Sequence, residues 1–266
     1  MSVRGQLRSI WWATIVVAVF AALAPPTALA APPLGHITEF PLSDTSVQPT
    51  GIALGPDGNV WSTESQGDQI ARTDTSGSTT EFAVPTSNAR ATDIAAGPDG
   101  ALWFTENNTN KIGFVKTDGT VGTGFTVPSA NSQPDGITLG SNGRLWFTEA
   151  LGNRIANVDG LGNFHEFPAL PNANSTPTSI VLGPDGAYWF TELTGNRIGR
   201  IDTSGNVTEY PIPTANSAPA DIAVGPDGLW FVENGANQVA RIDVSGSRPL
   251  FFFASDRSNC SSRSGA

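Results

Sequence analysis

The ten residues GPDGALWFTE (97–106) recur along the chain at an almost constant spacing. The copies stand at 55–64, 97–106, 140–149, 183–192 and 225–233. Each copy carries one tryptophan, and successive tryptophans are 42, 43, 43 and 41 residues apart. A fixed period in the low forties is typical of repeat proteins, in which each unit buries its apolar face against its neighbours.

Four short strand-like stretches fill each repeat, and in the first repeat they are 50–55, 60–64, 69–72 and 80–82. The first stretch of the later repeats stands at 92–97, 135–140, 178–183 and 220–225. The Pro-Asp-Gly step after it predicts a tight turn, because proline presets φ and glycine accepts positive φ. Four antiparallel strands in about 42 residues are typical of a β-propeller blade. We therefore predict an all-β propeller whose first strands line the axis and whose tryptophans pack between blades.

The ends of the repeat region leave the number of blades open. The first three strands occur five times, and the fourth occurs six times if 37–40 and 249–253 are both counted. Either the N-terminal strand completes a five-bladed ring, or the five repeats belong to a truncated six- or seven-bladed ring. The repeat vocabulary stops after 246, so we interpret 247–266 as a non-repeat tail that is disordered or the product of a shifted reading frame.

Residues 1–30 have the three regions of a secretory signal peptide. Arg4 and Arg8 give a positive start, 10–24 is an apolar run of 15 residues, and Ala28-Leu29-Ala30 is an A-x-A cleavage pattern. The run is shorter than the roughly 20 apolar residues of a membrane span, and an uncleaved anchor is the alternative. We predict that 31–246 is a secreted, extracellular and monomeric propeller, free of the membrane once the signal is cleaved.

The charge balance narrows the choice of partners. The leader carries two of the 14 basic residues and no acidic one, which leaves 12 basic and 24 acidic residues. Nucleic acid is excluded as a partner, because its binding relies on lysine and arginine at phosphates. Cys260 is the only cysteine, so neither an intrachain disulfide nor a cysteine-based zinc site is expected. A small-molecule or peptide ligand at the mouth of the central channel suits this composition.

The repeat vocabulary resembles that of the virginiamycin B lyase, or streptogramin lyase, family. The resemblance rests on GPDGALWFTE (97–106), TGNRIGRID (194–202) and VTEYPIPTANSAP (207–219), and it covers about 36–246. It implies a seven-bladed propeller. Lyases of this family linearise cyclic streptogramin B antibiotics by elimination across the ester bond, with a divalent metal that is usually magnesium.

The sequence departs from the family at the catalytic base. The family's base is a histidine in a Pro-His step that opens an inner strand. The matching positions here are Thr50, Thr92, Asp135, Thr178 and Ala220, and none is histidine. The family's metal-binding glutamate ends a second strand, and that position is glutamate in all five repeats. The resemblance therefore supports the metal-binding glutamates, but no residue of this sequence matches the family's catalytic histidine.

Direct pairing across the Pro-Asp-Gly turn predicts that Glu106 lies opposite Asp93 and Glu233 opposite Asp221, with Cβ atoms about 4.5–5.5 Å apart. Carboxylates gathered in this way at one mouth of the channel would suit a hard cation, Mg²⁺ or Ca²⁺. The candidate metal ligands are Glu106, Glu149, Glu192 and Glu233. The candidate binding residues are Thr50, Asp93, Asp135, Thr178 and Asp221, and Asp135 is also the candidate base.

Each candidate has a structural alternative. A glutamate repeated in every blade could hydrogen-bond a neighbouring turn or pair with Arg154 or Arg197. His36 and His165 are expected on the surface, far from the axis, and the aspartates of the Pro-Asp-Gly steps are expected to serve only as turn residues. Two functions stay open: a lyase-like enzyme that opens a lactone or cyclic depsipeptide, and a non-catalytic extracellular propeller that binds a glycan, a peptide or a cell-wall component.

Overall fold

The computed structural model describes residues 37–42 and 46–244. The chain divides into two units, Met1–Glu39 and Phe40–Ala266. Of the first unit only 37–39 are described, and these residues are exposed and have no regular secondary structure. The predicted signal peptide, His36 and the predicted tail lie outside the described residues.

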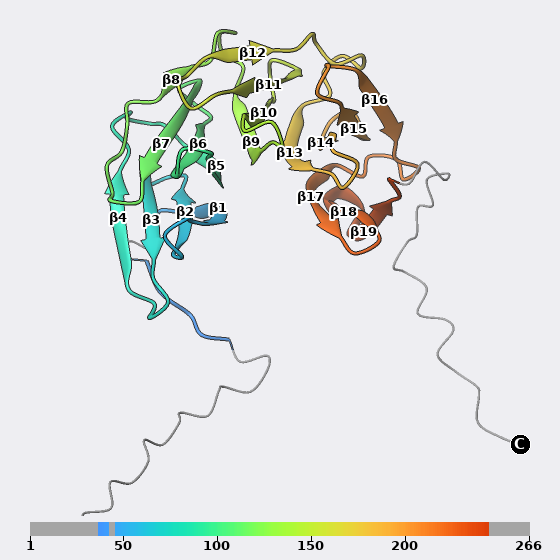
Figure 1. The fold of residues 1–266 in the computed structure, drawn as a ribbon. Coiled ribbons are helices and arrows are strands. Elements are labelled where there is room, and N and C mark those ends of the chain that lie inside the picture. The colour runs from blue at the N-terminus through green and yellow to red at the C-terminus, as the bar shows by residue number, and fades with distance from the viewer. Residues whose placement is uncertain (1–36, 43–45, 245–266) are drawn as a thin grey trace, which may run out of the picture. The chain divides into compact units, whose positions relative to one another are not determined.

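Five antiparallel sheets follow one another in chain order within the second unit (Figure 1). The first sheet contains β1 (Pro49–Leu54), β2 (Val60–Glu64), β3 (Gln69–Thr73) and β4 (Thr79–Ala83). The second contains β5 (Ala91–Ala96), β6 (Ala101–Glu106), β7 (Lys111–Lys116) and β8 (Phe125–Thr126). The third contains β9 (Pro134–Leu139), β10 (Leu145–Glu149), β11 (Arg154–Val158) and β12 (Phe164–Glu166).

The fourth sheet contains β13 (Pro177–Leu182), β14 (Tyr188–Glu192), β15 (Arg197–Ile201) and β16 (Val207–Pro211). The fifth has three strands in the described part of the chain, namely β17 (Pro219–Gly225), β18 (Gly228–Glu233) and β19 (Gln238–Ile242), with the 3₁₀ helix η1 (Asn234–Ala236) after β18. The described residues 37–40 form no strand, contrary to the sequence-based expectation, and 249–253 lies beyond the described residues.

The tryptophans pack between sheets, as predicted. Trp61 of the first sheet clusters with Ile94, Leu102 and Phe104 of the second. The same arrangement recurs around Trp103, Trp146 and Trp189 at the next three junctions. Burying this apolar surface is worth about 25 cal/mol per Å², so the junctions hold the sheets together. The fold is a β-propeller made of these blades.

The pairing of each inner strand with its neighbour differs from the prediction. Ala91, and not Asp93, lies opposite Glu106, and Pro219, and not Asp221, lies opposite Glu233. A bulge after the first residue of each inner strand accounts for one residue of this difference. The pairing across the turn, which places Ile94 opposite Phe104 and Ile222 opposite Phe231, accounts for the other. In the second sheet the freed N–H of Asp93 is satisfied by the hydroxyl of Thr105, at 3.1 Å.

Within the described residues, no helical segment has the length and apolar composition needed to cross a bilayer.

Candidate functional site

A cavity of about 540 Å³ is lined by all five inner strands, β1, β5, β9, β13 and β17. Neighbouring inner strands contact one another in chain order, and this brings residues from distant repeats to one place. The five predicted binding residues all line the cavity: Thr50, Asp93, Asp135, Thr178 and Asp221. The structure therefore brings together the residues that sequence reasoning placed at the axis.

Asp93 links two inner strands across the cavity wall. Its Oδ1 accepts a hydrogen bond from the N–H of Ile94 at 2.8 Å, and its Oδ2 accepts one from the N–H of Ile137 at 2.9 Å. Burial raises the pKa of Asp93 to about 6, against the effect of these two hydrogen bonds, and the negative charges of Asp135 and Asp221 add to the rise. The carboxyl group of Asp93 thus titrates close to neutral pH.

Asp135, the candidate base, is half-buried on β9. Burial raises the pKa of its carboxyl group, while a hydrogen bond from Thr92 and the positive charge of Arg90 oppose the rise. A raised pKa brings a carboxylate closer to the working pH of a general base. The role of Asp135 as a base stays a prediction, and the direction of this pKa shift favours it.

The polar groups beside these carboxyl groups bind the neighbouring strand. The Thr50 hydroxyl donates to the carbonyl oxygen of Thr92 at 2.8 Å, and the Thr178 hydroxyl donates to that of Ala220 at 3.3 Å. Asp221 accepts a 2.6 Å hydrogen bond from the Ser179 hydroxyl. The hydroxyl protons of Thr50 and Thr178 are thus engaged in hydrogen bonds between strands, so toward a ligand these hydroxyl groups can act only as acceptors.

The candidate metal ligands lie elsewhere. None of the described glutamates lines the cavity, and the four side chains are 0–1 % exposed inside their own sheets. Glu106 accepts a hydrogen bond from Thr109 at 2.8 Å, Glu149 lies 4.0 Å from Arg154, and Glu233 accepts one from Gln238 at 2.9 Å. The contact of Glu106 with a turn and the pairing of Glu149 with Arg154 agree with the structural alternative, whereas both carboxylate oxygens of Glu192 are buried without a hydrogen-bond partner among the described residues.

The donor set does not fit a divalent metal. Across 37–42 and 46–244, no group of three or more His, Cys, Asp or Glu side chains is arranged to hold an ion. Burial raises the pKa of Glu149 and of Glu192 to about 7, and it also raises that of Glu106. Burial thus disfavours the charged form of these carboxyl groups, which is the form that binds a hard cation.

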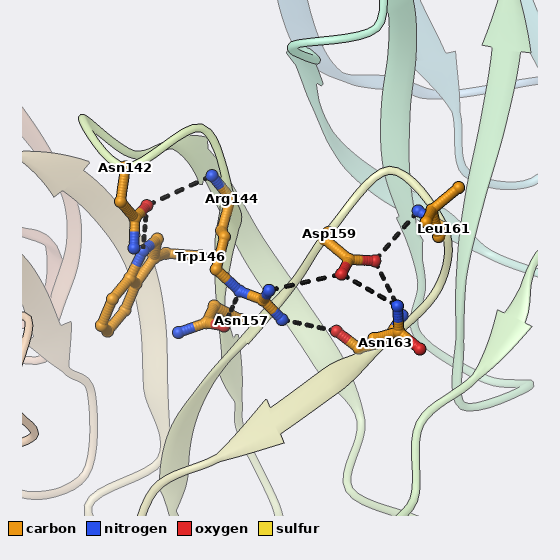
Figure 2. Close-up of polar contacts among 7 residues, drawn as sticks. All are labelled: Asn142, Arg144, Trp146, Asn157, Asp159, Leu161 and Asn163. Atoms are coloured by element: carbon orange, nitrogen blue, oxygen red, sulfur yellow. Dashed lines mark hydrogen bonds and ion pairs between the residues drawn. The ribbon is translucent and has the colours of Figure 1, made fainter.

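The aspartates of the Pro-Asp-Gly steps have a role that the sequence analysis missed. The indole N–H of Trp103 donates to Asp99 at 3.0 Å, and equivalent bonds join the corresponding pairs of the first, fourth and fifth sheets. In the third sheet Asn142 accepts the bond from Trp146, beside a polar network centred on Arg144 (Figure 2). The sequence carries a signal for these indole hydrogen bonds, because an Asp or Asn stands four residues before most of the tryptophans.

His165 lies far from the cavity, as predicted. It is exposed on the outer strand β12, where its ring meets that of Phe167 edge-on at 4.6 Å. It is the only histidine among the described residues, so no described histidine stands at the cavity.

The sheets and their shared cavity define a β-propeller with a carboxylate-lined axial site. The model of the family described as the Virginiamycin B lyase family matches residues 35–260. The chain belongs to this family. A comparison with curated proteins gives no match.

Solved structures of lyases are similar along most of the chain. A virginiamycin B lyase from Staphylococcus aureus is 39 % identical, with a TM-score of 0.78 over 82 % of this chain and 73 % of its own. A structure described as streptogramin B lyase is 40 % identical, with a TM-score of 0.76 over 81 % and 71 %. A catalytically inactive histidine-to-alanine variant of the S. aureus enzyme, solved with quinupristin, is also 40 % identical, with a TM-score of 0.74 over 80 % and 71 %.

Proposed function

We propose that this protein is secreted, binds a cyclic depsipeptide or lactone at the mouth of the channel, and opens its ester slowly by elimination. Family membership at about 40 % identity supports the ligand class. The observation that carries the proposal is the convergence of Asp93, Asp135 and Asp221 in a cavity shared by all five inner strands. A cavity of about 540 Å³ is within the range of sites that hold small ligands.

Asp135 is the proposed base. Elimination removes a proton from the carbon next to a carbonyl group, forms a carbon–carbon double bond, and breaks the ester C–O bond so that the electron pair leaves with the carboxylate. Asp135 takes the proton, and its raised pKa makes it a better base than an exposed aspartate. Histidine, with a free pKa of about 6.5, would still be better matched to neutral pH, so slow turnover is expected.

A divalent cation, Mg²⁺ or Ca²⁺, remains a prediction from the resemblance. Because the buried glutamates do not fit it, no step proposed here passes through a metal.

A non-catalytic binding propeller is the second candidate, for a glycan, a peptide or a cell-wall component. It is favoured by one observation, namely that no described histidine stands at the cavity.

Calorimetric titration of the purified protein with a cyclic streptogramin B tests whether the channel mouth binds a ligand of this class, with or without turnover. Binding at the channel mouth should weaken at least tenfold when Ser179→Asp adds a negative charge beside Asp221. Lack of binding to the unmodified chain would contradict the proposed ligand class, and binding without turnover would favour the non-catalytic candidate.

A further inference from the structure

A second cavity, of about 430 Å³, adjoins the first between the first two sheets. It shares Thr50 and Thr92 with the channel cavity, so one ligand can reach both. Among the described residues its lining is polar throughout and includes one acidic side chain, Asp68, and Arg90 is the only basic residue that lines either cavity.

The walls of the second cavity are held by hydrogen bonds. Gln66 donates to Gln48 at 2.8 Å on one side, and Asn108 donates to Asn88 at 3.3 Å on the other. The carboxylate of Asp68 accepts the N–H of Asn88 at 2.6 Å. These contacts fix the shape of the cavity, and most small-ligand sites are largely pre-formed in this way.

The main chain at Arg90 is fixed at both ends of the residue. Its N–H donates to Asp68 at 3.4 Å, and its carbonyl oxygen accepts the N–H of Asn107 at 3.2 Å. The φ angle of Arg90 is +50°, and the same turn recurs before each inner strand. The residues at the equivalent positions are Gln48, Gln133, Thr176 and Ala218, all with positive φ. Because four other side chains serve there, the turn itself does not require arginine.

The guanidinium group of Arg90 stands apart from those of the other described arginines. Each of the others makes an ion pair, a hydrogen bond or a ring contact with the protein; they are Arg72, Arg144, Arg154, Arg197, Arg200 and Arg241. Within the described part of the chain, the Arg90 guanidinium makes no hydrogen bond, close ion pair or ring contact, and its positive charge acts on Asp135 at the channel cavity. An exposed arginine that lines a polar cavity and whose guanidinium group has no hydrogen bond to the protein is available to a ligand.

We propose that the second cavity is a carboxylate subsite and that Arg90 is the residue that binds the carboxylate. The planar fork of a guanidinium group matches the two oxygens of a carboxylate, which gives a bidentate, charge-assisted pair. This inference rests on the proposed function, because elimination across an ester turns the ester oxygens into a free carboxylate. The proton goes to Asp135, the C–O bond breaks, and Arg90 receives the released group.

Binding of a ring-opened ligand tests the subsite without any turnover. The probe is the linear acid made by alkaline hydrolysis of the ester of a streptogramin B, compared with its amide, by calorimetry at low ionic strength. The variant is Arg90→Gln, because glutamine already occupies the same turn at Gln48 and Gln133. Lys116→Gln is the control for the loss of one positive charge, since Lys116 is exposed at the end of β7.

The acid should bind the unmodified protein at least tenfold more tightly than the amide does. Arg90→Gln should remove this preference, Arg90→Lys should keep part of it, and Lys116→Gln should keep all of it. Equal binding of acid and amide, or a preference that survives in Arg90→Gln, would overturn the subsite while leaving the proposed function in place. Binding of neither form would contradict the proposed ligand class together with the subsite.

Discussion

Asp99 shows how much one turn residue can do in this fold. It stands in a Pro-Asp-Gly turn, yet its carboxylate also accepts the indole N–H of Trp103, whose ring is 1 % exposed. Sequence reasoning found the turn because proline and glycine preset its backbone. It missed the indole contact, because that contact depends on how the tryptophan ring lies in the junction.

Replacing Asp99 by alanine should lower the free energy of unfolding by about 1–3 kcal/mol, the cost of leaving a buried donor without a partner. Asp99→Asn should cost much less, since Asn142 makes the same bond to Trp146 in the third sheet. Urea denaturation measures both changes. Equal losses in the two variants would show that the hydrogen bond is not the cause.

The titration of Glu192 should make the free energy of unfolding depend on pH. Burial raises the pKa of its carboxyl group from the usual 4.5 to about 7 in the folded state. The folded chain therefore holds a proton that the unfolded chain releases, and the free energy of unfolding should fall as the pH rises from about 4.5 to about 7. Glu192→Gln should reduce this fall, as denaturation at pH values across that interval would show. An unchanged pH profile in the variant would contradict the assignment.

At the level of the strands, a threonine side chain, Thr148 in the third sheet, holds the bulged start of the inner strand in place. The Thr148 hydroxyl accepts the N–H of Gly136 at 3.0 Å inside the bulge and donates to the carbonyl oxygen of Thr178 in the next inner strand at 2.7 Å. The start of each inner strand was predicted to within one residue. The bulge was not, because its cause is a side chain that bonds two separate strands. The predicted glutamate–aspartate pairs failed because of the bulge and because the pairing across each turn is shifted by one residue.

Thr148→Val keeps the shape of the side chain and removes both bonds. It should lower the free energy of unfolding by about 1–3 kcal/mol. Val232, at the equivalent position of the fifth sheet, is 39 % exposed, so Val232→Thr should change stability by less than about 0.5 kcal/mol. Thermal denaturation compares the two, and a similar effect at both positions would contradict the bridging role of Thr148.

Across the whole repeat region, the inner-strand isoleucine of each sheet after the first is buried against the preceding sheet. Ile94, Ile137, Ile180 and Ile222 are 3–4 % exposed, while the equivalent Ile52 of the first sheet is 72 % exposed. The sequence predicted the repeat, the propeller and the axial residues, because these follow from periodicity alone. It did not predict the polar cavity at Arg90, since that cavity forms between turns of two different sheets.

Core truncation should therefore depend on the position of the sheet. Ile137→Ala should cost about 2–5 kcal/mol, as expected for a buried aliphatic side chain, whereas Ile52→Ala should cost less than about 0.5 kcal/mol. Chemical denaturation of both variants checks this difference. A large loss at Ile52 would show that its side chain is covered in solution.

The central claim is that Asp135 acts as a base on an ester bound at the channel mouth. The most direct measurement is to incubate the purified protein with a cyclic streptogramin B and separate the products by liquid chromatography with tandem mass spectrometry. Elimination gives an open isomer of unchanged mass that contains a dehydro-amino acid, whereas hydrolysis adds one water. We predict the open isomer, at a rate below the ~1–10³ s⁻¹ typical of enzymes, and its loss in Asp135→Asn. Elimination that continues in Asp135→Asn, or bound substrate that stays intact with the unmodified protein, would contradict the claim.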